Sequence, residues 1–458
     1  MDVRLRLYLW CMEVEGWNMN VKLHLGIDDT DSMKGGCTTY IAALLVYEYS
    51  KLGVSWMDYP NLVRLNPNIP WKTRGNGAVS LRFEVDKSMI DDVVDVALKV
   101  IEKESMIDDE NVDPVLAVYR GCITDELRRF AYLAETEVVD VEYALKLADS
   151  LGVARWVFRN PRGLVGALAA IGEDLRGDYT YELIAYRTFS MRGKPRMIDP
   201  GSVIAMDEAT RGETYANIDP ETGRILITPR GMDPVLYGIR GETPEAVYRA
   251  HRFIKSYEEV ERWVIFRSNQ CTDAHLKSKR TISSLKPYVA AVLEGVVSDR
   301  PRIIPGGHVI FKLSDGTGTI DCAVYEPTGR LRVIASKLVD GDRVRVYGGV
   351  KPFDKGLTFN IEKIEVLEAR AITRIMNPLC PYCGRRMKSA GLGKGFRCGR
   401  CGFRDRGSAK IEIYMDRDLK PGLYLPPPRA FRHLTKPIER YGREKTGGVV
   451  WFYPWHEP

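Results

Sequence analysis

Three aspartates, Asp28, Asp29 and Asp31, lie in a short loop that follows a strand-like run. Phosphoryl transfer requires Mg²⁺ between phosphate oxygens, and Mg²⁺ prefers carboxylate oxygens and water as ligands. We expect a helix to begin at Thr38 or Thr39, where free N–H groups and a hydroxyl would lie beside the same phosphate. The segment lacks the Gly-Lys-Ser/Thr ending of a Walker A motif, and a solvated acidic turn is the alternative interpretation.

Two glycine-containing segments are further phosphate candidates. Lys72 and Arg74 lead into the turn Gly75-Asn-Gly, which suits a nucleotide, although Asn-Gly also predicts a hairpin turn. Arg162 precedes Gly163 at an expected helix start, where the backbone can approach a phosphate closely. The small residues that follow also predict a helix that packs tightly against its neighbour. Together with the aspartate loop and the helix start after it, these segments give the cofactor-binding candidates Thr30, Thr39, Lys72, Arg74, Gly75, Arg162 and Gly163.

Four cysteines predict a metal site near the C-terminal end. Cys380, Cys383, Cys398 and Cys401 form two Cys-x2-Cys pairs with fourteen residues between them. Four thiolates on two short turns make a closed tetrahedral Zn²⁺ site, and a closed site is structural because no position stays open for a substrate. The other five cysteines are scattered, which favours buried thiols over a disulfide framework.

Positive charge is concentrated in the C-terminal part of the chain. From residue 286 onward there are 31 Lys and Arg against 18 Asp and Glu, whereas the first 285 residues carry a net charge of −7. Nine basic residues crowd the cysteine cluster between 385 and 410, and a basic tail with aromatic side chains follows. This pattern is typical of nucleic-acid binding, with a solvated basic face as the alternative. The tail aromatics could stack on bases or only dock the C-terminus.

The surrounding segments predict an α+β chain. In the N-terminal part, strand-like runs over 21–27 and 78–85 alternate with helical patterns over 38–53, 89–104, 124–135 and 141–151. Further on, strands over 202–205, 225–228, 235–239 and 263–267 with a helix over 244–257 predict a ferredoxin-like domain. Five later strands, with a helix over 331–338 between the third and fourth, predict an OB-fold β-barrel.

These patterns divide the chain into four domains, over 19–195, 196–285, 286–370 and 371–458, the last holding the zinc ribbon and the basic C-terminal tail. Residues 1–18 are interpreted as an extension or a mis-assigned start. The sequence shows neither a signal peptide nor an apolar run long enough to cross a membrane, so a cytoplasmic location is expected.

Several motifs, taken in order, resemble the archaeal tRNA(Ile) 2-agmatinylcytidine synthetase family, also called agmatidine synthase. They occupy residues 26–32, 37–39, 64–67, 72–77 and 269–273, and the OB-fold pattern and the zinc ribbon follow. The resemblance covers about residues 19–440. The order of the four domains is more specific than any one motif.

The resemblance implies a kinase-like α/β N-terminal domain in which Thr38 is autophosphorylated and Asp28, Asp29 and Asp31 handle Mg–ATP. It implies an ATP-dependent ligase that joins agmatine to C2 of the wobble cytidine of an isoleucine tRNA with a CAU anticodon. It further implies that agmatidine, which allows AUA decoding, forms through a phosphorylated cytidine and that ATP is consumed to AMP. The implied cofactors are ATP, Mg²⁺ and structural Zn²⁺. The implied partners are the tRNA and agmatine, with no membrane and no obligate protein partner.

This chemistry is physically reasonable, and the sequence leaves the amine pocket open. A cytosine C2 carbonyl is a poor electrophile, and phosphorylation of its oxygen creates a good leaving group. The base must leave its stack to react. The guanidinium of agmatine requires a carboxylate partner, for which Asp199, Asp233 and Asp273 are candidates, with a structural role as the favoured alternative for each.

Two other functions remain open at this point. A single-strand-binding protein without enzymatic activity would use only the OB-fold and the ribbon, and would not need the first half of the chain. A kinase acting on a protein or a small molecule would not need the OB-fold and the ribbon. ATP turnover measured with and without tRNA distinguishes all three.

Overall fold

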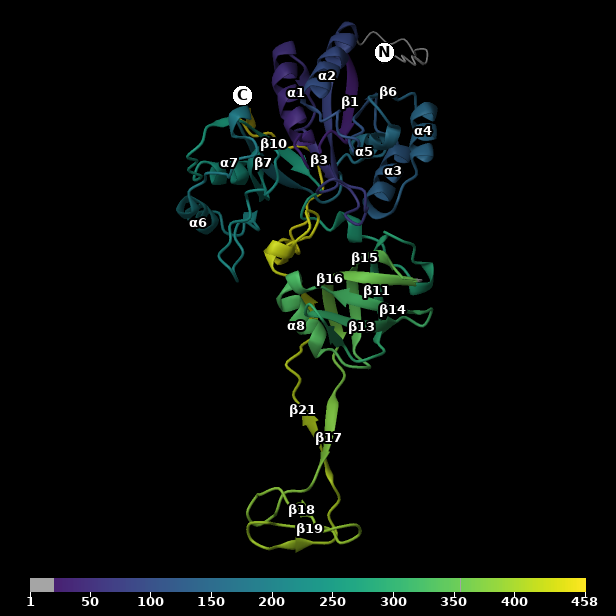
Figure 1. Cartoon of the computed structure of the whole chain (residues 1–458), viewed down its shortest axis with the longest axis vertical. Helices are drawn as coiled ribbons and strands as arrows, with labels where there is room; N and C mark the ends of the chain where they lie inside the picture. Colours follow the sequence, from purple (N-terminus) through teal and green to yellow (C-terminus); the bar gives the residue numbers. More distant parts are fainter. Residues whose placement is uncertain (1–19, 355) are drawn as a thin grey trace.

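The computed structural model describes residues 20–354 and 356–458. Residues 1–18, expected to be an extension or a mis-assigned start, lie outside the described residues. Figure 1 shows an elongated arrangement in which an upper body lies above a β-barrel, and a small domain hangs below the barrel on a two-stranded arm.

The upper body is built on one eleven-stranded sheet. Its main path runs β6 (Ala154–Val157), β5 (Val115–Arg120), β1 (Asn20–Asp28), β4 (Gly77–Asp86), β3 (Asn61–Arg64), β10 (Val260–Ser268), β7 (Thr180–Arg187), β9 (Val235–Gly241) and β8 (Thr214–Tyr215). Strands β3 and β10 pair in parallel, and all other neighbouring strands along this path pair antiparallel. β1 is a central strand, so the aspartate loop leaves the sheet from its middle.

Helices cover both faces of the sheet around β1. Helices α1 (Thr38–Leu52) and α2 (Ile90–Glu104) share one buried core with Leu23, Leu25 and Ile27 of β1. Helices α3 (Asp125–Thr136), α4 (Val141–Ser150) and α5 (Leu164–Gly172) form a second core on the opposite face. A strand presents alternate side chains to opposite faces, so the sheet is buried on both sides here. The four helices expected from periodicity in this region are confirmed.

The second region of the body differs from its prediction in two elements. The run 202–205 was expected as a strand, but it lies in helix α6 (Pro200–Ala209), where Asp199 accepts a hydrogen bond from the Ser202 N–H and Pro200 occupies the first turn. The run 225–228 forms only an isolated bridge between Ile218 and Ile225. Short apolar runs do not distinguish strand from helix, and the capping residues decided the first case.

The other elements of this region are close to expectation. Helix α7 (Pro244–His251) is shorter than predicted, and β9 and β10 occupy the expected positions. β7 precedes residue 196 yet pairs with both β9 and β10. The sheet therefore continues across residue 196, and the domain boundary expected there stays a prediction.

The barrel contains the five expected strands, β11 (Ala290–Val297), β13 (His308–Ser314), β14 (Thr319–Val324), β15 (Arg343–Phe353) and β16 (Gly356–Glu368). Pairing between β11 and β13 closes the sheet, and helix α8 (Arg330–Lys337) lies between β14 and β15 as predicted. Two short strands, β12 (Arg302–Ile304) and β22 (Gly422–Tyr424), extend it. This is the OB-fold pattern.

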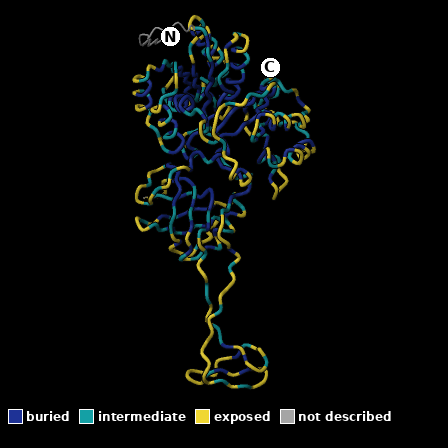
Figure 2. The backbone as a smooth tube through the Cα atoms, turned by 180° about the vertical axis from the view of Figure 1, so that it is seen from behind, coloured by how far each residue is buried: buried dark blue, intermediate teal, exposed yellow. Residues whose placement is uncertain are grey.

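The arm consists of β17 (Ile372–Met376) paired with β21 (Ile411–Met415). Beyond it lie β18 (Lys388–Ser389), β19 (Phe396–Arg397) and β20 (Arg404–Asp405). The buried core of this tip contains only Cys380, Met387, Phe396 and Cys398. Figure 2 shows that the arm and tip are largely exposed. So small a core requires a metal or a covalent link for stability.

The basic tail does not stay on the surface. After β22 the chain returns to the body, where β23 (His456–Glu457) pairs with β10. Arg440 is fully buried, and Trp455 is only 4% exposed. The ring centroid of Trp451 lies 4.7 Å from that of Tyr59. Of the two alternatives for the tail aromatics, docking of the C-terminus is therefore the one observed.

Candidate functional site

A cavity of about 690 Å³ brings together three segments that the sequence singled out. Asp28, Asp29 and Asp31 line it with Lys72, Arg74, Gly75 and Arg162. Apolar side chains, including Leu65, Ile69, Trp71, Val138 and Val141, line another part of its wall. Acidic, basic and apolar groups thus share one space, which suits a ligand with phosphate and ring components.

The aspartate loop fits closely against the start of helix α5. Asp28 ends β1, and Asp29 has a left-handed backbone with φ 58°. A Cβ on Gly166 would lie 1.8 Å from Asp28 Oδ2, and one on Gly163 would lie 2.6 Å from the Asp113 carbonyl oxygen. These glycines therefore permit the close packing that the sequence suggested, and the same packing places Arg162 beside the aspartates.

Two arginines pair with the aspartates. Arg162 lies 3.1 Å from Asp29, and Arg74 lies 2.6 Å from Asp31 and 2.9 Å from Asp233. Arg74 thereby connects the aspartate loop to the second region of the body.

Burial shapes the charge of the cavity. Burial, followed by the neighbouring Asp29, raises the pKa of Asp28 well above its ordinary value, and burial also raises the pKa of Asp29. Carboxylates that are costly to ionise accept a cation favourably, so Asp28 and Asp29 fit a divalent metal bound with phosphate oxygens. Among residues 20–354 and 356–458, however, the three aspartates do not bring three ligand atoms close enough together to hold one metal ion.

The threonine candidates lie beside the cavity rather than on its wall. Thr38 begins α1, is 5% exposed, and its hydroxyl lies 3.0 Å from that of Thr30, which is fully buried. The Thr39 hydroxyl lies 3.1 Å from Cys37 Sγ. The expected helix start is confirmed, but its hydroxyls are occupied by neighbouring side chains.

The segment around Lys72 forms part of a long loop between the antiparallel strands β3 and β4, not a tight hairpin turn. Lys72 Nζ donates to the Ile69 carbonyl at 2.9 Å. A Cβ on Gly75 would lie 2.6 Å from the His433 ring, so glycine lets the returning tail approach this loop.

The three carboxylates proposed for agmatine all have partners within the protein. Asp199 caps α6, Asp233 pairs with Arg74 and Arg196, and Asp273 pairs with the buried Lys363. Of these, only Asp233 contacts a residue that lines the cavity. The amine pocket therefore stays unassigned.

Two buried acidic residues near the cavity were not predicted from the sequence. Asp113 lies 3.5 Å from Arg162 and accepts a hydrogen bond from Asn160. Glu135 accepts a hydrogen bond from Asn269 at 2.8 Å, and burial raises its pKa to about 8. Neither belongs to a recognisable motif, so only the fold could reveal that they flank the site.

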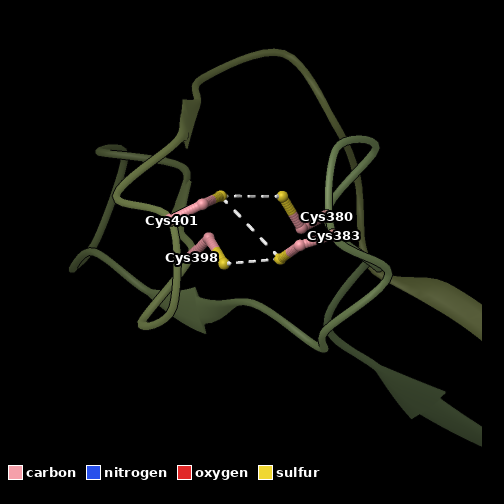
Figure 3. A group of neighbouring side chains, drawn as sticks. All are labelled: Cys380, Cys383, Cys398 and Cys401. Atoms are coloured by element: carbon pink, nitrogen blue, oxygen red, sulfur yellow. Dashed lines mark hydrogen bonds between the residues drawn. The ribbon is translucent and has the colours of Figure 1, made fainter.

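The four cysteines form the expected metal site (Figure 3). All four sulfur atoms lie within 4.8 Å of one another. The separations are 3.5 Å for Cys380–Cys401, 3.4 Å for Cys383–Cys398 and 3.8 Å for Cys383–Cys401. Tetrahedral Zn²⁺ with Zn–S bonds of about 2.3 Å places its sulfur atoms about 3.8 Å apart. Backbone N–H groups of Cys401 and Arg400 lower the pKa of Cys398 to about 6, which favours the thiolate that binds metal.

Models of known families match most of the chain. Those described as the TiaS TCKD domain and the TiaS FLD domain match residues 24–160 and 161–275. An OB-fold nucleic acid binding domain matches 291–367, and the TiaS C-terminal zinc ribbon domain matches 377–419. The α+β architecture with an OB-fold and a zinc ribbon is confirmed.

A curated relative, the isoleucine-tRNA 2-agmatinylcytidine synthetase TiaS of Staphylothermus marinus, is 42% identical over 92% of this chain and 94% of its own length. The chain belongs to the TiaS family. The TiaS protein of Archaeoglobus fulgidus is 41% identical over 93% of this chain and 99% of its own length. The resemblance inferred from the motifs is thus confirmed for almost the whole chain.

Solved TiaS structures share this fold. The crystal structure of apo TiaS superposes with a TM-score of 0.83 at 39% identity, covering 94% of this chain and 100% of that one. A TiaS complex with its isoleucine tRNA, AMPCPP and agmatine gives 0.79 at 37% identity, covering 94% and 99%. In this chain, no helix among the described residues has the length and apolar character needed to span a membrane.

Proposed function

We propose that this chain uses ATP to join agmatine to C2 of the wobble cytidine of an isoleucine tRNA with a CAU anticodon. The product is agmatidine, which allows AUA decoding. The observation that carries this proposal is the cavity in which the three aspartates, Lys72, Arg74 and Arg162 line one space. Membership of the TiaS family supports it, because TiaS relatives are named for this reaction and one TiaS structure holds an isoleucine tRNA, an ATP analogue and agmatine.

The reaction we propose has two parts. A phosphoryl group of ATP is transferred to O2 of the cytosine: the O2–P bond forms, a phosphoanhydride P–O bond of ATP breaks, and the remaining nucleotide leaves with the bridging oxygen. The primary amine of agmatine then attacks C2, the C2–O bond breaks with phosphate as the leaving group, and the nitrogen loses a proton. The base must leave its stack to reach the cavity, whose apolar wall, including Trp71, suits an unstacked ring.

Asp28 and Asp29 are the residues that we propose for Mg²⁺. When bound, Mg²⁺ neutralises phosphate charge and aligns the transferred group. Arg162 and Arg74 pair with Asp29 and Asp31, so both guanidinium groups lie within reach of phosphate oxygens that enter the cavity. We infer a kinase-like role for this domain and a ferredoxin-like arrangement of β7, β9 and β10 with α7.

We also propose that Thr38 is autophosphorylated. Its hydroxyl lies at the start of α1, close to the aspartate loop through Thr30. Because Thr38 is 5% exposed, the loop before α1 must open to admit ATP. Thr38→Val preserves the shape and removes the hydroxyl, so we expect a folded protein that takes no phosphate label at this position. Persistent label on the Thr38 peptide, read by mass spectrometry, would exclude this residue.

The deciding experiment incubates the protein with ATP, Mg²⁺, radiolabelled agmatine and an isoleucine tRNA transcript bearing CAU. We expect label in the tRNA, and none with a transcript whose wobble base is uridine. Asp28→Asn should abolish labelling while tRNA binding persists. Absence of label from a folded protein that binds the tRNA tightly would contradict the proposed reaction.

A further inference from the structure

A second cavity, of about 380 Å³, lies beside the first, where the upper body meets the barrel. The two cavities share Leu65, Lys72, Arg74, Gly75 and Asn76. Lys351 of β15 contributes from the barrel, and Arg432 contributes from the returning tail. Three segments that are distant in sequence thus meet at this cavity, which we call the junction pocket. The sequence alone did not predict that they would meet.

The cations of the junction pocket are poorly neutralised. Lys72 Nζ and Lys351 Nζ donate to the carbonyl oxygens of Ile69 and Asn68, at 2.9 and 2.5 Å. Neither lysine has a carboxylate oxygen within 4.0 Å among the described residues. The pocket therefore contains two ammonium groups whose only observed acceptors are neutral.

The remaining charges of the pocket do not restore balance. Arg432 lies 3.3 Å from Glu362, which is already engaged by His275. Among the described residues, the Arg64 side chain hydrogen-bonds to two neutral partners, the Gln270 side chain and the Gly75 carbonyl. Arg74 differs, because Asp31 and Asp233 pair with it. Apart from Arg74, the Lys and Arg side chains in the lining thus have one carboxylate within 4.0 Å among the described residues, the Glu362 partner of Arg432, which leaves a positive excess.

Burial and neighbouring cations lower the pKa of both lysines. Burial, then Lys72 and Arg432, lowers the pKa of Lys351 to about 8. Burial and Arg432 lower the pKa of Lys72 as well. Cations that are held together at such a cost gain most from an anion between them.

Close packing holds these groups in position. A Cβ on Gly349 would lie 2.1 Å from Asn68 Oδ1, so glycine lets the barrel approach the loop of the body. Arg432 donates to the same Asn68 oxygen at 2.9 Å, and Asn66 donates to the Tyr288 carbonyl at 2.8 Å. The pocket is therefore organised before any ligand arrives, as an anion site requires.

We propose that the junction pocket binds a backbone phosphate of the tRNA, next to the nucleotide whose base enters the larger cavity. This rests on the proposed function. A phosphate of ATP has the same chemistry, but two observations favour RNA. The site lies between the body and an OB-fold barrel, a fold that binds nucleic acids. Trp71, next to Lys72 in sequence, lines the larger cavity and is 51% exposed, as a base-stacking side chain would be.

The test measures equilibrium binding of the isoleucine tRNA transcript over a range of salt concentrations, and binding of AMPCPP separately. In Lys351→Ala we expect a roughly tenfold weaker tRNA affinity and a slope of log K against log salt that is smaller by about one. Lys351→Arg should retain most of the affinity. AMPCPP affinity should be unchanged. The matched control is Lys312→Ala, which removes a barrel lysine that pairs with Asp321 and does not line the pocket.

Unchanged tRNA affinity and salt slope in Lys351→Ala would overturn the proposal. Weakened AMPCPP binding with unchanged tRNA binding would also overturn it and assign the pocket to ATP. If Lys351→Ala unfolds, Lys351→Gln gives the same reading, since its amide keeps a donor for the Asn68 carbonyl and carries no charge. Agmatine is absent from these measurements. A wild-type protein that binds the tRNA but forms no agmatidine would therefore contradict the proposed function without deciding this site.

Discussion

Two basic segments follow the barrel, and the fold treats them in opposite ways. Of the nine basic side chains between 385 and 410, all but Arg386 are exposed on the zinc-bearing tip. In the returning tail, Arg429, Arg432, Lys436 and Arg440 all pair with carboxylates of the body or the barrel. Composition alone predicted nucleic-acid binding for both. Among the described residues, none of the basic side chains of the tip forms an ion pair.

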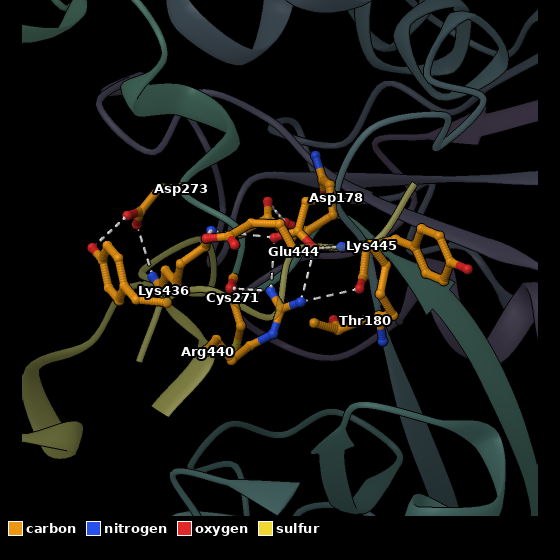
Figure 4. Close-up of polar contacts among 12 residues, drawn as sticks. Asp178, Thr180, Cys271, Asp273, Lys436, Arg440, Glu444 and Lys445 are labelled. Carbon is orange, nitrogen blue, oxygen red and sulfur yellow. Dashed lines mark hydrogen bonds and ion pairs between the residues drawn. The ribbon is translucent and has the colours of Figure 1, made fainter. Parts of the chain in front are cut away.

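The acidic partners explain the difference. Arg440 lies 2.8 Å from Asp178 and 2.7 Å from Glu242, and it also donates to the Cys271 carbonyl (Figure 4). These partners lie far from Arg440 in sequence. In the tip, Asp405 is the one acidic residue between 385 and 410. A basic segment becomes an internal connector where the fold supplies carboxylates, and remains a surface where it does not.

The largest effect is expected from removal of the metal. Cys380→Ser should reduce zinc from about one ion per chain to none and unfold the tip, because the buried core of the tip is too small to hold it without the metal. The body and barrel should melt as before. Zinc content by mass spectrometry and thermal unfolding measure both, with the exposed Cys122→Ser as control. Full zinc content in Cys380→Ser would refute the assignment.

Loss of the buried arginine is expected to destabilise the fold itself. Arg440→Met removes the buried guanidinium from Asp178 and Glu242, which keep only Lys436 and Lys445 as partners, and this should cost up to about 3 kcal/mol of unfolding free energy. The matched change Arg400→Met, on the exposed tip, should cost almost nothing. Urea unfolding measures both, and Asp178→Asn added to Arg440→Met should recover part of the loss. Equal effects of the two single changes would remove the distinction between tail and tip.

For tRNA affinity, the change on the tip is expected to have a larger effect than a change in the tail. Arg400→Met should weaken binding about threefold and reduce the salt slope by up to about one, as removal of a single phosphate contact does. Arg429→Met, in the tail, should leave the slope unchanged because Asp219 and Glu221 already neutralise that guanidinium. Binding isotherms over a range of salt concentrations test both. A steeper loss in Arg429→Met would show that the tail also contacts RNA.

Lowering the pH is expected to produce the smallest effect, a loss of stability through Glu242. Burial opposes ionisation of Glu242, but hydrogen bonds from Arg440 and Lys445 outweigh it and lower its pKa. A carboxyl with a lowered pKa contributes stability above its unfolded pKa of about 4.3, and this is lost as pH falls below that value. Unfolding free energy should therefore fall between about pH 6 and about pH 3 from this group. In Arg440→Met the decline should be shallower, and an identical decline would contradict the assignment.

Local patterns were enough for much of this architecture. Helix α1 and the barrel with α8 follow from periodicity and spacing, and the zinc cluster follows from two cysteine pairs. Where a short apolar run had no clear period, as at 202–205, the prediction was wrong. There the cap Asp199 and Pro200 at the first turn carried the decisive signal.

The candidate site was recognised only in pieces. The aspartate loop, Lys72, Arg74 and Arg162 were each singled out, and the cavity confirms that they meet. That Arg74 would pair with both Asp31 and Asp233 could not be read from the chain, since these residues lie in separate segments. The catalytic roles assigned to these residues stay predictions.

By itself, the sequence determined what is local: the helix and strand periods, the four thiolates that can hold zinc, and the order of motifs that places the chain in its family. The tertiary structure decided which charges remain free. A side chain's charge is set by its type, but its availability depends on burial and on partners that only folding brings within a few ångströms. That is why Arg440 became a buried connector while Lys351, without a carboxylate, was left facing a pocket.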